Sequence, residues 1–61
     1  MTRWSVRRVT VGSILTMWQV FRVVDGVEEI AGHNYAIQED AVNLMRALNA
    51  QEKALEQRQP L

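Results

Sequence analysis

The chain contains no cysteine, which excludes disulfide bonds, thiolate nucleophiles and cysteine-ligated zinc. Small secreted domains are usually rich in disulfides, so this absence favours a cytoplasmic location. The single histidine, His33, has no carboxylate at a spacing typical of metal ligands, and neither Ser5 nor Ser13 has an evident general base. We therefore expect no catalytic, cofactor-binding or metal-binding residue, no cofactor, no small-molecule substrate and no enzymatic activity.

Long apolar runs are also absent. The most hydrophobic stretch, residues 9–24, is interrupted by polar side chains and falls short of the about 20 apolar residues that a membrane-spanning helix needs. Arg3, Arg7 and Arg8 precede this stretch, as in a signal peptide, but no small-residue cleavage site follows it. We expect neither a membrane segment nor a cleaved leader.

Proline and glycine are scarce: Pro60 is the single proline, and glycine occurs three times. The chain has 61 residues, 48% hydrophobic and 23% charged, which is typical of one small globular domain rather than a disordered segment. A chain of this length buries only about 60% of its unfolded surface, so its core is marginal. We expect a single domain over residues 1–56 and a frayed tail over residues 57–61, where Pro60 prevents a helix from continuing.

The formal net charge is zero, but the two signs are separated along the chain. Residues 1–24 contain four arginines and no acidic residue, whereas residues 25–61 contain seven acidic and three basic residues. The two parts either attract each other, within one fold or across a dimer, or present a basic arm to a partner. We favour the first interpretation.

The strongest local signal is Asp25-Gly26, which lies between two valine-containing runs and predicts a β-hairpin with a two-residue turn. The turn sets the register of the two strands. The predicted pairs are Val24–Val27, Val23–Glu28, Arg22–Glu29, Phe21–Ile30 and Val20–Ala31. Because side chains alternate, one face carries Leu15, Met17, Phe21, Val23 and Ile30, and the other carries Trp18, Val20, Val24, Val27 and Ala31. Both faces are therefore apolar.

Further strand signals flank this turn. A long strand over residues 14–24 is predicted to follow a turn at Gly12-Ser13. The N-terminal segment also alternates, but its apolar residues change phase at Arg7-Arg8, which predicts a β-bulge or a strand that ends and restarts. The return strand is expected over residues 27–32, with His33-Asn34 in a loop.

The last segment changes to helical periodicity. Its apolar residues recur on one side of a helix, at Ile37, Ala41, Leu44, Met45, Leu48 and Leu55. Glu39 and Asp40 lie in the predicted first turn, where negative charge is favourable. The capping position is poor, since Ala36 or Ile37 stands where serine, threonine or aspartate is preferred.

Glu52 interrupts this apolar stripe, so we expect firm docking to stop near Leu48. The end of the helix stays open between Leu48 and Gln59. The predicted fold is α+β: an antiparallel β-hairpin or a three-stranded sheet, in the order β-β-β-α, packed on one C-terminal amphipathic helix.

One helix can cover only one of the two apolar sheet faces. Phe21 lies opposite Ile30 in the predicted register, so we expect the helix on that face. The Trp18 face then requires another cover, which is the N-terminal segment, a second copy of the chain or a target protein. We favour a protein partner. The residues expected at that interface are Trp4, Arg7, Arg8, Trp18 and Val20.

Nucleic-acid binding is the alternative function. Arg3, Arg7, Arg8 and Arg22, together with Trp4, combine guanidinium groups with an aromatic ring, as a surface that follows a phosphate backbone does. The acidic helix would oppose such binding. A third possibility is a structural subunit of a large assembly, in which residues 3–8 form an ordered arm.

Five short motifs occur within residues 18–49: Trp18-Gln19-Val20, Asp25-Gly26, Ala31-Gly32, Glu39-Asp40-Ala41 and Leu48-Asn49. This arrangement resembles small bacterial and phage proteins that consist of a hairpin followed by a helix. Ile37 departs from their pattern, in which a helix-capping residue is usual. The resemblance implies a ββα unit without an active site, and a phage-encoded or prophage-encoded protein that binds or inhibits a host protein. We expect a small non-catalytic protein-interaction module, acting as a homodimer or on a larger partner.

Overall fold

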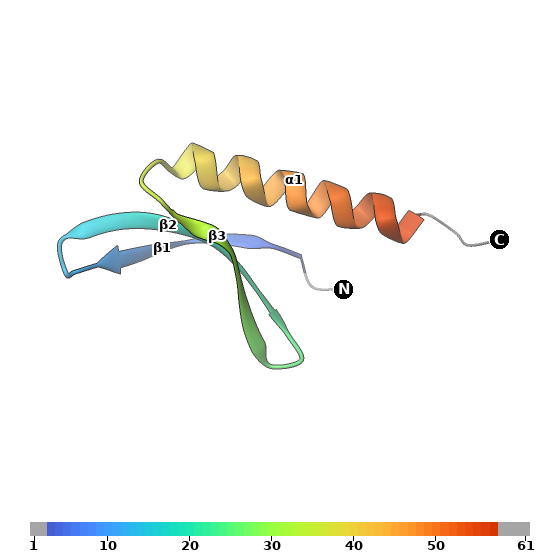
Figure 1. The fold of residues 1–61 in the computed structure, drawn as a ribbon, viewed down its shortest axis with the longest axis horizontal. Helices are drawn as coiled ribbons and strands as arrows, with labels where there is room; N and C mark the ends of the chain where they lie inside the picture. The colour runs from blue at the N-terminus through green and yellow to red at the C-terminus, as the bar shows by residue number, and fades with distance from the viewer. Residues whose placement is uncertain (1–2, 58–61) are drawn as a thin grey trace.

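The computed structural model describes residues 3–57 as a three-stranded antiparallel sheet followed by one helix (Figure 1). The elements are β1 (Ser5–Val11), β2 (Leu15–Val24), β3 (Val27–Tyr35) and α1 (Gln38–Gln57). The strands pair in the order β1-β2-β3, so β2 is the central strand. The predicted α+β class is confirmed, with the sheet in its three-stranded form.

The turn between β2 and β3 has the geometry that its sequence predicts. Asp25 and Gly26 both have positive φ angles, of 52° and 78°. Positive φ at both central positions defines a type I′ turn, whose twist matches that of the flanking strands. The pairing then runs from Val24–Val27 to Val20–Ala31 in the predicted register, so these pairs are confirmed.

The first hairpin turns through Gly12 and Ser13, as predicted, and both residues have positive φ angles, of 62° and 67°. The connection comprises residues 12–14, because Val11 pairs with Leu15. Ile14 therefore lies at the tip of the hairpin rather than in β2, and 88% of its surface is exposed.

β1 pairs with β2 along its whole length without interruption. The bulge or break predicted at Arg7-Arg8 is therefore wrong. Val6 pairs with Val20 on one side of the sheet, whereas Val9 pairs with Met17 on the other side. The apolar phase changes in β1 because both sides of the sheet receive apolar residues, not because the strand breaks.

The irregularity lies instead in β3. Trp18 pairs with Tyr35 and Val20 with Ala31, so residues 32–34 lie opposite Gln19 alone. The loop predicted at His33-Asn34 is therefore wrong, because β3 continues through both residues to Tyr35.

Gly32 begins this irregular segment with a φ angle of 67°, in the region that favours glycine. A Cβ atom there would lie 2.9 Å from Tyr35 Oη and 3.4 Å from Leu44 Cδ2. The missing side chain therefore leaves room for the Tyr35 hydroxyl, while Leu44 of α1 lies at ordinary van der Waals distance.

α1 begins after Ile37, whose carbonyl accepts a hydrogen bond of 3.1 Å from the Asp40 amide. Ile37 thus occupies the capping position without a capping side chain, as predicted, and the acidic first turn favours the positive end of the helix. The helix continues to Gln57, well past Leu48. The rest of the predicted tail lies outside the described residues.

α1 lies on the sheet face that carries Val20. The core contains Val20 from β2 and Ala41 from α1, both fully buried. Leu44 of α1 comes close to Gly32 of β3. The prediction that the helix covers the Phe21–Ile30 face is therefore wrong, and Ile30 stays 45% exposed.

We expect Val20→Ala to lower the free energy of unfolding by about 2 kcal/mol, because two buried methyl groups are lost and a cavity remains. Val27→Ala removes the same atoms from a side chain that is 64% exposed, and we expect it to cost under about 1 kcal/mol. Urea unfolding of the two variants measures the difference. Equal losses would contradict the placement of α1.

Candidate functional site

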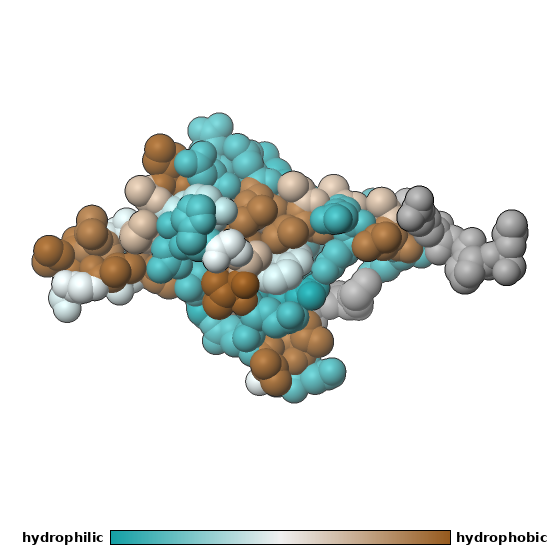
Figure 2. Space-filling model, in the orientation of Figure 1, coloured by the Kyte–Doolittle hydropathy of each residue, from teal (hydrophilic) through white to brown (hydrophobic). Residues whose placement is uncertain are grey.

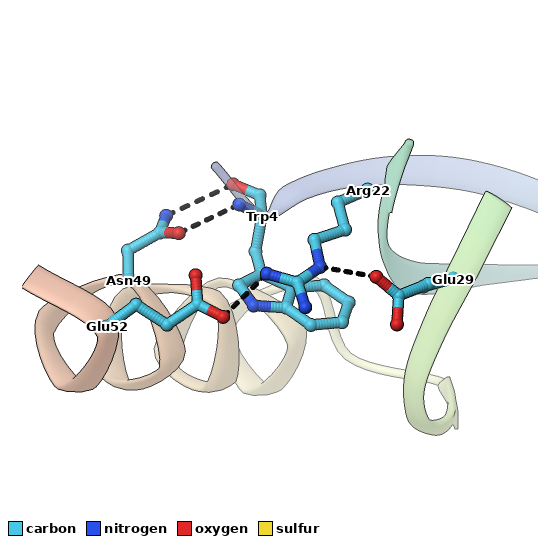
Figure 3. Close-up of polar contacts among 5 residues, drawn as sticks. All are labelled: Trp4, Arg22, Glu29, Asn49 and Glu52. Atoms are coloured by element: carbon cyan, nitrogen blue, oxygen red, sulfur yellow. Dashed lines mark hydrogen bonds and ion pairs between the residues drawn. The ribbon is translucent and has the colours of Figure 1, made fainter. Parts of the chain in front are cut away.

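A polar cluster lies on the side of the sheet that α1 covers, which we call the helix side. It joins the N-terminal segment, the sheet and α1 (Figure 3). The Arg22 guanidinium lies over the Trp4 ring, 4.3 Å from its centroid. Arg22 Nε donates a hydrogen bond of 2.8 Å to Glu29 on β3. Arg22 Nη1 donates another, of 2.5 Å, to Glu52 on α1. Arg22 thus connects two strands and the helix to the N-terminal tryptophan.

Arg22 keeps its charge in this position. Desolvation lowers the pKa of Arg22, but hydrogen bonds and charge attraction from Glu29 and Glu52 outweigh it, so the pKa is raised above its usual value. Glu52, which interrupts the apolar stripe in the sequence, therefore extends the docking of α1 beyond Leu48 through an ion pair.

Asn49 fixes the N-terminal segment to the same helix. Its Oδ1 accepts a hydrogen bond of 2.8 Å from the Trp4 amide, and its Nδ2 donates one of 3.1 Å to the Trp4 carbonyl. One side chain therefore satisfies both backbone groups of Trp4, as a neighbouring strand would. The Trp4 indole Nε1 is buried without a partner among the described residues.

These contacts change the interface expected from the sequence. Trp4 and Trp18 are half-buried on the helix side, and Val20 is fully buried. We correct the prediction for Val20, because a side chain under α1 cannot contact a partner. Trp4 is held between Arg22 and Asn49 and contributes to the fold.

The opposite side of the sheet is covered by nothing in the described chain. Alternation in the observed register brings seven apolar side chains from all three strands to this side. We call this surface the open face; its apolar members are Val9, Val11, Leu15, Met17, Phe21, Val23 and Ile30. Four are substantially exposed: Val11 39%, Leu15 59%, Val23 44% and Ile30 45%.

A polar network crosses the middle of the open face. Arg7 donates hydrogen bonds of 2.9 and 2.6 Å to Gln19 Oε1, and it also pairs with Glu28. Gln19 Nε2 donates a bond of 3.1 Å to Asn34 Oδ1. The Arg7 guanidinium lies 4.2 Å from the centroid of the Phe21 ring. The network links β1, β2 and β3, and its two formal charges cancel.

Hydrophobic side chains also gather at the two hairpin ends, where Figure 2 shows brown patches at the left and at the bottom. Ile14 and Leu15 belong to the first end, and Val23 and Val27 to the second. Leu15 and Val23 belong to the open face, so its apolar surface reaches both ends of the sheet, whereas Ile14 and Val27 lie outside it.

The four arginines proposed for nucleic-acid contact do not share one surface. Arg7 lies on the open face, whereas Arg22 and Arg8, which pairs with Trp18, lie on the helix side. Arg7 and Arg22 are bound to carboxylates, and Arg3 and Arg8 are exposed, with no ion pair to a described residue. The basic segment is thus partly neutralised by the acidic one.

Within residues 3–57, no group of three or more histidine, aspartate or glutamate side chains is placed to hold a metal ion. Among the same residues, no helix combines the length and apolar character needed to cross a membrane. No family model matches the chain, and no match was found among curated proteins or solved structures.

Sequence reasoning missed Asn49 and Glu52 as docking residues, and it assigned Phe21 and Ile30 to the wrong environment. The sequence of β1 contains a signal for the second apolar face, because Val9 pairs with Met17 and both lie on the same face as Phe21. The register derived from Asp25-Gly26 covers only β2 and β3, so it does not include Val9.

We expect Asn49→Ala to reduce the free energy of unfolding by about 2 kcal/mol, because two backbone groups of Trp4 lose their partner. Asn43→Ala is the matched control on the exposed side of α1, and we expect it to leave stability nearly unchanged. Urea unfolding followed by tryptophan fluorescence compares the two. An equal effect of both substitutions would argue against a stabilising role for the hydrogen bonds between Asn49 and the Trp4 backbone.

Proposed function

We propose that this protein is a small non-catalytic protein-interaction module that binds through its open face. One observation carries the proposal: α1 covers one side of the sheet, while Leu15, Val23 and Ile30 stay exposed on the other. Soluble monomers rarely expose large contiguous apolar patches, and those that do usually bind something there.

The polar groups of the open face are suited to burial. Arg7 and Gln19 already have hydrogen-bond partners on the same surface, so a partner protein would not leave them unsatisfied. Phe21 lies beside this network, with Ile30 opposite it across the strand pair. Aromatic side chains such as phenylalanine are enriched at protein interfaces.

The resemblance to small bacterial and phage proteins supports a more specific form of the proposal. In that form the protein is phage- or prophage-encoded, acts in the cytoplasm and binds or inhibits a host protein. The alternative, nucleic-acid binding by Arg3, Arg7, Arg8 and Arg22, receives no support from their positions on different surfaces. A salt-dependent shift with DNA or RNA would favour it.

Capture from a lysate of the cell of origin tests the proposal. We expect Val23→Thr/Ile30→Thr to weaken capture of bound protein by about tenfold or more, because two apolar contacts are removed from the open face. Val27→Thr/Ile37→Thr is the control, since it alters apolar residues that are even more exposed, at 64% and 60%, but lie outside that face, and it should capture normally.

Nuclease treatment of the lysate separates the two functions. Capture that survives treatment supports a direct protein partner, and capture that disappears supports nucleic acid. Equal capture by the open-face variant and the control would overturn the proposed surface.

A further inference from the structure

We infer that a second copy of the chain covers the open face, so that two sheets pack face to face with both helices outside. The inference rests on the proposed function, because it assigns a particular protein partner to the same surface. Packed sheets lie about 10 Å apart, and side chains from both inner faces form the shared core. The assembly would have four layers, α1 and the sheet from each copy.

The exposed area of the single chain matches what such a dimer needs. The chain exposes 4834 Å², whereas a compact monomer of 7.0 kDa exposes about 4,000 Å². The excess over the whole chain is about 800 Å², which is of the size that each partner buries in an interface of standard size. The exposed apolar residues of the open face are part of this surface.

The core of the single chain is small. Among the described residues, Val20 and Ala41 are the buried hydrophobic side chains, so the single chain has little core to stabilise it. A copy of itself is the partner that is present wherever the chain is made.

The chemistry of the open face is complementary to itself. A two-fold axis places the same surface on both sides of the interface, so an unbalanced charge would repel its copy. Here Arg7 and Glu28 neutralise each other. Apolar residues lie on both sides of the polar network, with Met17 toward one hairpin end and Val23 toward the other. A two-fold axis that passes through the network, either parallel or perpendicular to the strands, therefore places apolar residues of one copy opposite apolar residues of the other.

Sedimentation equilibrium of the purified chain tests the inference, over concentrations from about 1 µM to about 1 mM. We expect the wild-type protein to dimerise and Val23→Thr/Ile30→Thr to weaken dimerisation by about tenfold or more. Val27→Thr/Ile37→Thr should dimerise as the wild type does. Circular dichroism shows whether each variant is folded.

A second measurement needs no substitution. In a mixture of isotope-labelled and unlabelled chains, filtered nuclear Overhauser spectra detect contacts between copies only. Contacts from the methyl groups of Met17, Val23 and Ile30 support the inference. Contacts confined to Ile14, Ile37 or Leu55 overturn it, because these residues lie outside the open face.

The outcomes separate this inference from the proposed function. A wild-type protein that stays monomeric, yet captures a lysate protein through the open face, overturns the dimer and leaves the proposed function intact. A dimer that persists in the folded open-face variant, with capture also unchanged, overturns both.

Discussion

The structure depends on one geometric constraint, which is that a single helix can cover only one side of a three-stranded sheet. Both sides of this sheet are apolar, because β1 and β2 place hydrophobic side chains alternately on each. The position of α1 therefore decides which residues form the core and which form the surface. Val20 is fully buried, while Val23, three positions along the same strand, is 44% exposed.

The helix side is selected by several contacts that act together. Leu44 packs beside Gly32 of β3, Asn49 binds the backbone of Trp4, and Arg22 pairs with Glu52. The last contact also explains the separation of charge along the chain. Basic residues of the segment 1–24 meet acidic residues of the segment 25–61 within one fold, as they do again where Arg7 pairs with Glu28.

Much of the fold could be predicted from local sequence. The Asp25-Gly26 turn and its strand register, the turn at Gly12-Ser13 and the acidic start of α1 follow from short-range rules of backbone conformation and charge. The errors concern β1 and β3. The phase change at Arg7-Arg8 predicts a bulge or a break, and His33-Asn34 a loop, only when each strand is considered without the neighbour that it pairs with.

Local patterns determined where the chain turns, which side chains alternate and which side of α1 is apolar, since those properties depend on residues a few positions apart. The choice between the two sheet faces was decided only in the tertiary structure. It depends on contacts between residues 30 to 45 positions apart, such as Arg22 with Glu52 and Trp4 with Asn49. Their free energies add up only when all three strands and the helix are in place, so no local pattern encodes which face stays open.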